Sequence, residues 1–398
     1  EFPMSETQHA QFSPLRAMPP RDPGEAHRAA TPLELLFDLV SVIAIAAAAA
    51  GLHHAIAENH LADGIVTFVM AFFAIWWAWM NFTWFASAYD NDDTLFRLLT
   101  MVTMGGALTM AAGVSFLFSE HVLTTVIVGY VIMRVAMVLL WLRAARHDSL
   151  RRKTALAYAL GILIAQIYWV LLILIQPLSG AWLYGLFVLG VILELAVPAI
   201  AERYNTTPWH RHHIIERYGL LNIIVLGETL LAGSIAIRQA AAEGALEGLV
   251  PLAIAALIMV FCLWWLYFGR EDHLQSSNLG RALTWGYGHF LIFASGAAMG
   301  GGFAALVDIM TKHAEVPLIV GDYAVAIPVA LYMFGLWFVR DRFVLSGAGQ
   351  HVLLVFAALV LLVPLSPLAL EAIAAVTVAS VIARTAVGRS QYRAGSHG

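Results

Sequence analysis

Long runs of apolar residues alternate with short polar segments along most of this chain. The runs are close to or above the roughly 20 residues that a helix needs to cross a bilayer. They lack the strict alternation of a membrane β-strand, so they predict an all-α polytopic protein with about twelve transmembrane helices. The expected spans are residues 33–52, 64–87, 95–118, 122–142, 154–176, 181–200, 214–236, 247–268, 281–306, 319–339, 349–364 and 367–386. Only a Pro-containing turn separates the last two, so whether the 349–386 hairpin fully spans stays open.

Composition agrees with this pattern. Hydrophobic residues make up 61% and charged residues 12% of the 398 residues, whereas a soluble domain carries about 25% charged residues. No basic domain is present, so nucleic acid is not an expected partner. The single Cys262 lies in an apolar run, which excludes an intrachain disulfide and a Cys-rich metal framework.

The distribution of Lys and Arg predicts the orientation. If both termini are cytoplasmic, inside segments hold 19 of the 22 Lys and Arg residues. The outside loops then hold only Arg238 and Lys312, and Arg134 lies within a span. A different number of spans would disturb this alternation, so the positive-inside rule supports twelve.

Two similar blocks indicate an internal repeat. Residues 76–97 and 264–281 each contain a Trp pair, an aromatic cluster, an acidic turn and an Arg that opens the next apolar run. We therefore expect two parallel six-helix repeats, with any site at their interface. The expected divisions are a disordered cytoplasmic tail at 1–30 (with 1–3 a cloning remnant), repeats at 31–205 and 206–386, and a cytoplasmic tail at 387–398. Glycines of the third and ninth spans favour tight helix crossings.

Acidic residues inside the spans are the main candidates for function, because an ionisable group at the bilayer centre costs roughly 2.5–3.5 kcal/mol. Glu34 and Asp38 are four residues apart and share one helix face. Glu34 also has capping-box spacing from Thr31. A helix cap with no further function is therefore an alternative interpretation of Glu34. Asp38 lies a turn deeper, and Glu228 lies ten or more residues into the seventh span. We interpret both as ion or proton sites.

Arg134 is the only cation within a span. By helix rise it lies about 12 Å from the cytoplasmic boundary, Asp38 and Glu194 about 8–9 Å, and His289 about 12 Å. These similar depths indicate either a hydrated polar site or a structural ion pair of Arg134 with Glu194 or Asp38. Amides that could add hydrogen bonds to such a network are Asn81, Gln166 and Asn222.

Two loop motifs, one acidic and one rich in His, are weaker candidates, and the chemistry they suggest is metal binding. Asp90, Asp92 and Asp93 lie in a short inside loop, and their partial counterpart is the block at 270–273. Helix caps that pair with Arg97 and Arg281 are the favoured interpretation. The alternative is Mg²⁺ bound by hard carboxylate ligands, as in membrane enzymes that act on lipid diphosphates. The His-rich stretch at 210–213 has no Cys partner and is a weak transition-metal candidate.

Three ordered motifs resemble the bacterial low temperature requirement A (LtrA) family. They are Pro32-Leu33-Glu34-Leu35-Leu36-Phe37-Asp38-Leu39-Val40, the block from Trp76 to Leu99 with its acidic turn, and the segment from Glu216 to Glu228. Ser41 and Tyr218 depart from the usual pattern. The resemblance covers about residues 30–390 and implies a multi-span protein of the bacterial inner membrane. It implies no defined substrate or reaction.

The leading hypothesis is a secondary-transporter-like protein with a carboxylate and Arg site between the repeats. It would couple the transport of an unknown small ligand to the movement of a proton or cation. One alternative is a membrane protein that binds lipids or small hydrophobic molecules without turnover. The other is a metal-dependent enzyme acting on a lipid diphosphate, which is the less favoured class. Membrane lipids are expected partners. The sequence pattern does not indicate an oligomeric state.

Overall fold

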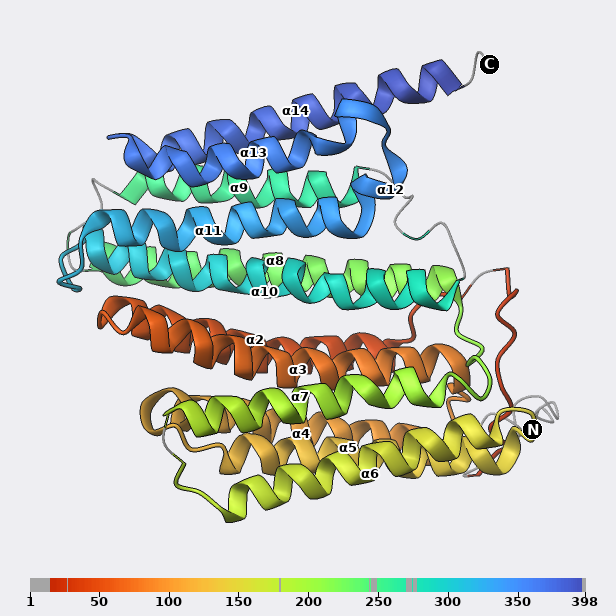
Figure 1. Cartoon of the computed structure of the whole chain (residues 1–398). Helices are drawn as coiled ribbons and strands as arrows, with labels where there is room; N and C mark the ends of the chain where they lie inside the picture. Colours follow the sequence, from red (N-terminus) through yellow and green to blue (C-terminus); the bar gives the residue numbers. More distant parts are fainter. Residues whose placement is uncertain are drawn as a thin grey trace, which may run out of the picture. The chain divides into compact units, whose positions relative to one another are not determined.

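The structure is a computed structural model that describes residues 15–26, 28–178, 180–242, 244, 249–269, 274 and 278–395. Within these ranges the chain forms helices and no strands (Figure 1). Twelve of the helical segments in the described ranges are long and apolar enough to cross a membrane, and each matches one predicted span. The prediction of an all-α polytopic membrane protein is therefore confirmed.

The long helices begin close to the predicted boundaries, and several of them continue past the predicted ends. In the first part of the chain they are α2 (Pro32–Ala57), α3 (Leu61–Tyr89), α4 (Thr94–Glu120), α5 (Thr124–His147), α6 (Arg152–Leu174), α7 (Gly180–Ala201) and α8 (Arg211–Ala242). They continue with α9 (Leu249–Phe268), α10 (Leu279–Met310), α11 (Leu318–Leu336), the π-helix η1 (Trp337–Asp341) and α12 (Arg342–Val344). The last hairpin consists of η2 (Gly347–His351), α13 (Val352–Leu362), η3 (Val363–Leu365) and α14 (Ala369–Gly395).

One compact unit, unit 1, comprises the described residues of 1–44 and 73–217. In it α4 packs on α5, α5 on α6 and α6 on α7. A Cβ added at Gly106 would lie 2.7 Å from the carbonyl oxygen of Gly129 on the facing helix. Small residues permit such an approach of two backbones, so the helix-crossing interpretation holds for Gly106.

The second compact unit, unit 2, comprises the described residues of 45–72 and 218–398. Here α10 packs on α11, α11 on α13, and α14 on both α9 and α13. A Cβ at Gly302 would lie 2.1 Å from the carbonyl oxygen of Ala324, which again indicates a tight crossing.

The two units differ from the predicted division at residue 205. The second part of α2 and the first part of α3, residues 45–72, belong to unit 2. The reason is that α2, α3 and α8 are continuous helices, each of which contributes residues to both units. The repeat relation between the halves stays a prediction.

Residues 15–26 and 28–30 differ from the disordered tail expected there. The backbone N–H of Arg21 donates to the carbonyl of Ala88 at 2.9 Å, and the guanidinium of Arg28 donates to the carbonyls of Ala86 and Ser87 at 2.7 and 2.9 Å. The last carbonyls of a helix have no partner within it, which explains why this segment binds the end of α3.

The C-terminal end also differs from the expected tail, because α14 continues through residues 387–395. Residues 1–14, including the cloning remnant predicted at 1–3, and residues 396–398 lie outside the described residues.

Candidate functional site

The start of α2 is fixed by a capping box. Pro32 occupies the first helical position, and Oε2 of Glu34 accepts from the N–H of Thr31 at 2.8 Å and from its hydroxyl at 3.0 Å. This is the cap predicted from the spacing. The other oxygen, Oε1, lies 3.0 Å from Nε2 of His213 on α8. Glu34 therefore serves both as a cap and as one partner of a buried contact between α2 and α8.

Asp38 lies one turn further along α2 and forms a buried ion pair. Its Oδ1 accepts from Nη2 of Arg217 at 2.6 Å and from the indole N–H of Trp79 at 2.7 Å. The side chains of Asp38 and Arg217 are both fully buried. Arg217 is not among the candidate residues of the sequence analysis, so this partner was missed.

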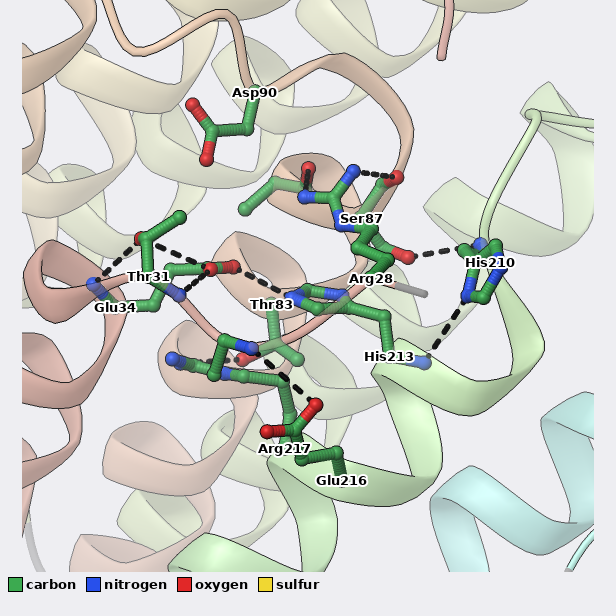
Figure 2. Close-up of polar contacts among 12 residues, drawn as sticks. Arg28, Thr31, Glu34, Thr83, Ser87, Asp90, His210, His213, Glu216 and Arg217 are labelled. Carbon is green, nitrogen blue, oxygen red and sulfur yellow. Dashed lines mark hydrogen bonds and ion pairs between the residues drawn. The ribbon is translucent and has the colours of Figure 1, made fainter. Parts of the chain in front are cut away.

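These contacts form a ladder of two rungs, Glu34–His213 and Asp38–Arg217, which we call the α2–α8 ladder. The rungs are four residues apart on each helix, so each pair shares a face of its helix. Figure 2 shows Glu34, His213 and Arg217 converging from the two helices. Oδ2 of Asp38 and both Nε and Nη1 of Arg217 have no hydrogen-bond partner among the residues that the structure describes. Two carboxylates thus face one guanidinium and one imidazole. The net charge of the ladder therefore depends on whether the imidazole and the carboxylates are protonated.

His210, the residue just before α8, lies beside His213 (Figure 2). The backbone N–H of His210 donates to the hydroxyl of Ser87 at 2.9 Å, and the ring atom Nε2 lies 2.7 Å from the carbonyl oxygen of Glu25. A carbonyl can only accept, so Nε2 carries the proton and Nδ1 accepts from the N–H of His213 at 3.3 Å. Both ring nitrogens of His210 are therefore used within the protein.

The acidic loop after α3 acts mainly through capping and Arg pairing. Asp93 caps α4 by accepting from the N–H of Phe96 at 2.9 Å and binds the guanidinium of Arg143. Burial opposes ionisation of Asp93, but the hydrogen bonds from Arg143 and from backbone N–H groups hold its pKa at about 2. Asp92 pairs with Arg97 at 2.6 Å. The capping interpretation is confirmed for this block.

Asp90 differs from Asp92 and Asp93 because it forms no ion pair with any residue that the structure describes. It is 4% exposed, and its Oδ1 accepts from the N–H of Asp92 at 2.8 Å. Burial, and then the nearby charge of Glu34, raise the pKa of Asp90 to about 6. No three His, Cys, Asp or Glu side chains in the described part of the chain are placed to hold a metal ion. The counterpart block at 270–273 lies outside the described residues, and the guanidinium of Arg281 donates to the carbonyl of Val339.

Arg134 pairs with Glu194 and not with Asp38. Nη2 of Arg134 donates to Oε2 of Glu194 at 2.7 Å. The indole N–H of Trp77 donates to the same oxygen at 3.0 Å, and Oε1 accepts from Gln166 and Trp169, both at 3.2 Å. All these side chains are buried, and each carboxylate oxygen accepts two hydrogen bonds. This Glu194 cluster matches the structural ion pair that the sequence offered as one interpretation.

Asn222 and His289 belong to unit 2 and have partners there. Oδ1 of Asn222 accepts from the hydroxyl of Tyr332 at 3.0 Å. Nδ1 of His289 donates to the carbonyl of Trp285 at 2.7 Å, so Nε2 accepts from the hydroxyl of Tyr267 at 3.1 Å. Of the residues predicted to share one layer, Asp38, Arg134 and Glu194 have their ion-pair partners within unit 1, and His289 has its partners within unit 2.

Glu228 borders a pocket of about 450 Å³ in unit 2. We call it the Glu228 pocket; it is lined mainly by Ala and Gly of α2, α8 and α10, with His53, His54 and Thr229. Glu228 is half-buried and has no hydrogen-bond or ion-pair partner within the described residues. His53 instead pairs with Asp308, with 2.6 Å between Nε2 and Oδ2. The pocket thus combines an unpaired carboxylate, in the middle of a spanning helix, with two imidazoles.

Comparison with known proteins identifies the family. The family model described as bacterial low temperature requirement A protein (LtrA) matches residues 29–387. The chain belongs to the LtrA family. An uncharacterized protein of Rhizobium meliloti (strain 1021) is 29% identical over 241 residues, which cover 59% of this chain and 57% of that protein. The chain thus spans somewhat more than half the length of this relative.

The LtrA motifs include the residues of the α2–α8 ladder on both sides. Glu34 and Asp38 lie in the first motif, and Arg217 lies in the third. Two signals could have led to Arg217 from the sequence. It follows His213 by four residues, which repeats the spacing of Glu34 and Asp38, and it is the only cation in the third motif.

Proposed function

We propose that this LtrA-family protein is a secondary-transporter-like membrane protein that binds a proton or cation at Glu228. The observation that carries the proposal is the position of this carboxylate beside the Glu228 pocket, without a partner in the described residues. A carboxylate within a membrane span must be protonated, paired with a cation or hydrated. The pocket offers space for a proton carrier, a cation or water next to it.

The α2–α8 ladder supports the same proposal. Its two carboxylates face one guanidinium, so protonation of His213 or of a carboxylate changes the charge balance. Arg217, and not Arg134, is the counter-charge of Asp38. Both the ladder and the Glu228 pocket are built on α2 and α8, so protons bound at either site act on the same pair of helices.

The Glu194 cluster has a different role in this proposal. Its carboxylate accepts four hydrogen bonds from buried donors, and hydrogen bonds made in a buried, low-dielectric site favour one fixed packing. We therefore assign Arg134 and Glu194 to the scaffold of unit 1. We place the protein in the bacterial inner membrane with both termini cytoplasmic, which the Lys and Arg distribution supports.

Proton flux into proteoliposomes tests the proposal. Vesicles loaded with a pH-sensitive dye receive the protein, and a potassium gradient with valinomycin imposes an inside-negative potential. We expect protein-dependent acidification with the native chain and none with Glu228→Gln. The control is Glu315→Gln, an exposed carboxylate of unit 2 outside the pocket, which should keep the native rate.

Each possible result bears on a different part of the proposal. Native rates with Glu228→Gln would remove Glu228 from any coupling role. Absence of flux with the native chain, also after addition of a mixture of small bacterial metabolites, would contradict transport. Size-exclusion profiles of both variants establish that a lost flux does not reflect misfolding.

A further inference from the structure

A second pocket in unit 2 has no part in the proposed transport function. Its volume is about 650 Å³, and it lies between the end of α9 and the segments η1 and α14. We call it the arginine pocket. The side chains that matter for its chemistry are Trp264, Trp265, Arg340, Arg384 and Arg389. Cationic and aromatic groups thus gather on one concave surface.

The arginine pocket carries surplus positive charge. Nε of Arg340 donates to Asp341 at 2.8 Å, and Arg384 donates to both oxygens of Asp341 at 2.8 and 2.9 Å. All three side chains are buried, so one carboxylate balances two guanidinium groups. Arg389, which is exposed, adds another positive charge at the rim. A buried charge without its counterion is costly, so this arrangement favours an anion.

Two guanidinium nitrogens remain available for that anion. Nη1 of Arg340 donates hydrogen bonds to the carbonyl oxygens of Leu266 and Tyr267, at 2.7 and 3.1 Å. Nη2 of Arg340 and Nη1 of Arg384 have no hydrogen-bond partner in the described ranges of the chain. Arginine presents its donors in a planar fork that matches the oxygens of a phosphate group.

The aromatic residues indicate where such a phosphate comes from. Trp264 and Trp265 lie near the end of α9 and are 45% and 55% exposed. Tryptophan is enriched at the membrane interface, at the level of the lipid headgroups. A basic pocket between spanning helices at that level is suited to the headgroup of an acidic lipid.

We propose that the arginine pocket binds the phosphate headgroup of an anionic glycerophospholipid. The guanidinium groups of Arg340, Arg384 and Arg389 neutralise the headgroup, and the tryptophans contact its glycerol and acyl portions. A zwitterionic lipid fits less well, because its ammonium group meets the surplus positive charge. The lipid binds as a resident ligand, and no covalent step is involved.

Native mass spectrometry of the delipidated full-length chain tests this proposal. Phosphatidylglycerol and phosphatidylethanolamine are titrated in separate experiments, and the affinity for the first bound lipid is compared. We expect tighter binding of phosphatidylglycerol. Arg389→Gln should weaken it about fivefold, the effect of one Arg near an anionic headgroup. Arg389 has no contact in the Asp341 cluster, so its replacement should leave folding intact.

Matched variants and a soluble anion complete the experiment. Arg389→Lys keeps the charge and should retain most of the affinity, whereas Arg146→Gln changes an exposed arginine of α5 and should have no effect. Equal affinity for both lipids, or native affinity in Arg389→Gln, would overturn the proposal. Displacement of the lipid by millimolar inorganic phosphate would assign the pocket to a soluble anion and also overturn it.

Discussion

Arg217 donates from Nη2 to Oδ1 of Asp38 at 2.6 Å, and both side chains are fully buried. The two residues are 179 positions apart in the chain, on helices that open the predicted first and second halves. A fully buried ion pair is seldom a large net source of stability, because both groups lose their hydration. Its importance lies in what happens when only one charge remains.

Breaking the Asp38–Arg217 pair from one side should be strongly destabilising. Asp38→Asn or Arg217→Gln leaves one uncompensated buried charge, with an expected loss of about 3–5 kcal/mol. The double variant should recover a large part of this loss. Thermal unfolding of the detergent-solubilised protein gives the coupling free energy by a double-mutant cycle. The exposed pair Asp92–Arg97 is the control, and the same cycle there should give little coupling. Additive losses at Asp38 and Arg217 would show that the pair is not coupled.

The buried carboxylate of Glu194 and the half-buried carboxylate of Glu228 should differ in how much stability an amide substitution costs. Glu194→Gln removes the charge that balances Arg134 and weakens four hydrogen bonds, so we expect a loss of about 3–5 kcal/mol in stability. Glu228 has no such partners, and Glu228→Gln should change stability by less than about 0.5 kcal/mol. Unfolding midpoints of the two variants compare these costs. Similar losses for both would mean that Glu228 also has a structural role.

The stability of the protein should fall as Asp90 ionises. Its folded-state pKa is about 6 against an ordinary value of 3.8, because burial and the charges of Glu34 and Asp92 outweigh the attraction of Arg28. The folded state therefore holds the proton more tightly, and the resulting stability is present below pH 3.8 and lost as pH rises to about 6. Asp90→Asn should remove this pH dependence and stabilise the protein at neutral pH by about 2–3 kcal/mol. Unfolding midpoints across this range measure it. An unchanged profile would contradict the raised pKa.

Alanine substitutions at Gly302 and Gly105 should differ in sign. A Cβ at Gly302 would meet the carbonyl oxygen of Ala324 at 2.1 Å, so the helices must separate, at an expected cost of about 1–3 kcal/mol. Gly105 has no atom within 4 Å of an added Cβ. Gly105→Ala should be neutral or stabilise the helix by up to about 1 kcal/mol. Unfolding midpoints compare the two, and a tolerated Gly302→Ala would argue against the tight crossing.

Local patterns in the sequence predicted the local features of the structure. The twelve spans follow from run length, the Thr31–Glu34 capping box follows from residue spacing, and the acidic block was expected to cap a helix and pair with Arg97. These features depend on neighbours within one or two turns, so nothing distant in the chain enters the prediction. The family was also recognisable, because its motifs are contiguous in the sequence.

The partners of the buried charges were decided only by the tertiary structure. Helix rise gives the depth of Arg134, Asp38 and Glu194 along their helices, but depth does not fix which way each side chain points. Packing and rotation of the helices assign Arg134 to Glu194 and Arg217 to Asp38. The same packing lets Arg21 and Arg28 bind the carbonyls at the end of α3. The sequence by itself thus determined which segments cross the membrane, because the cost of inserting a residue depends on that residue and its neighbours. The tertiary structure determined which charges neutralise each other, because that depends on contacts between helices distant in the chain.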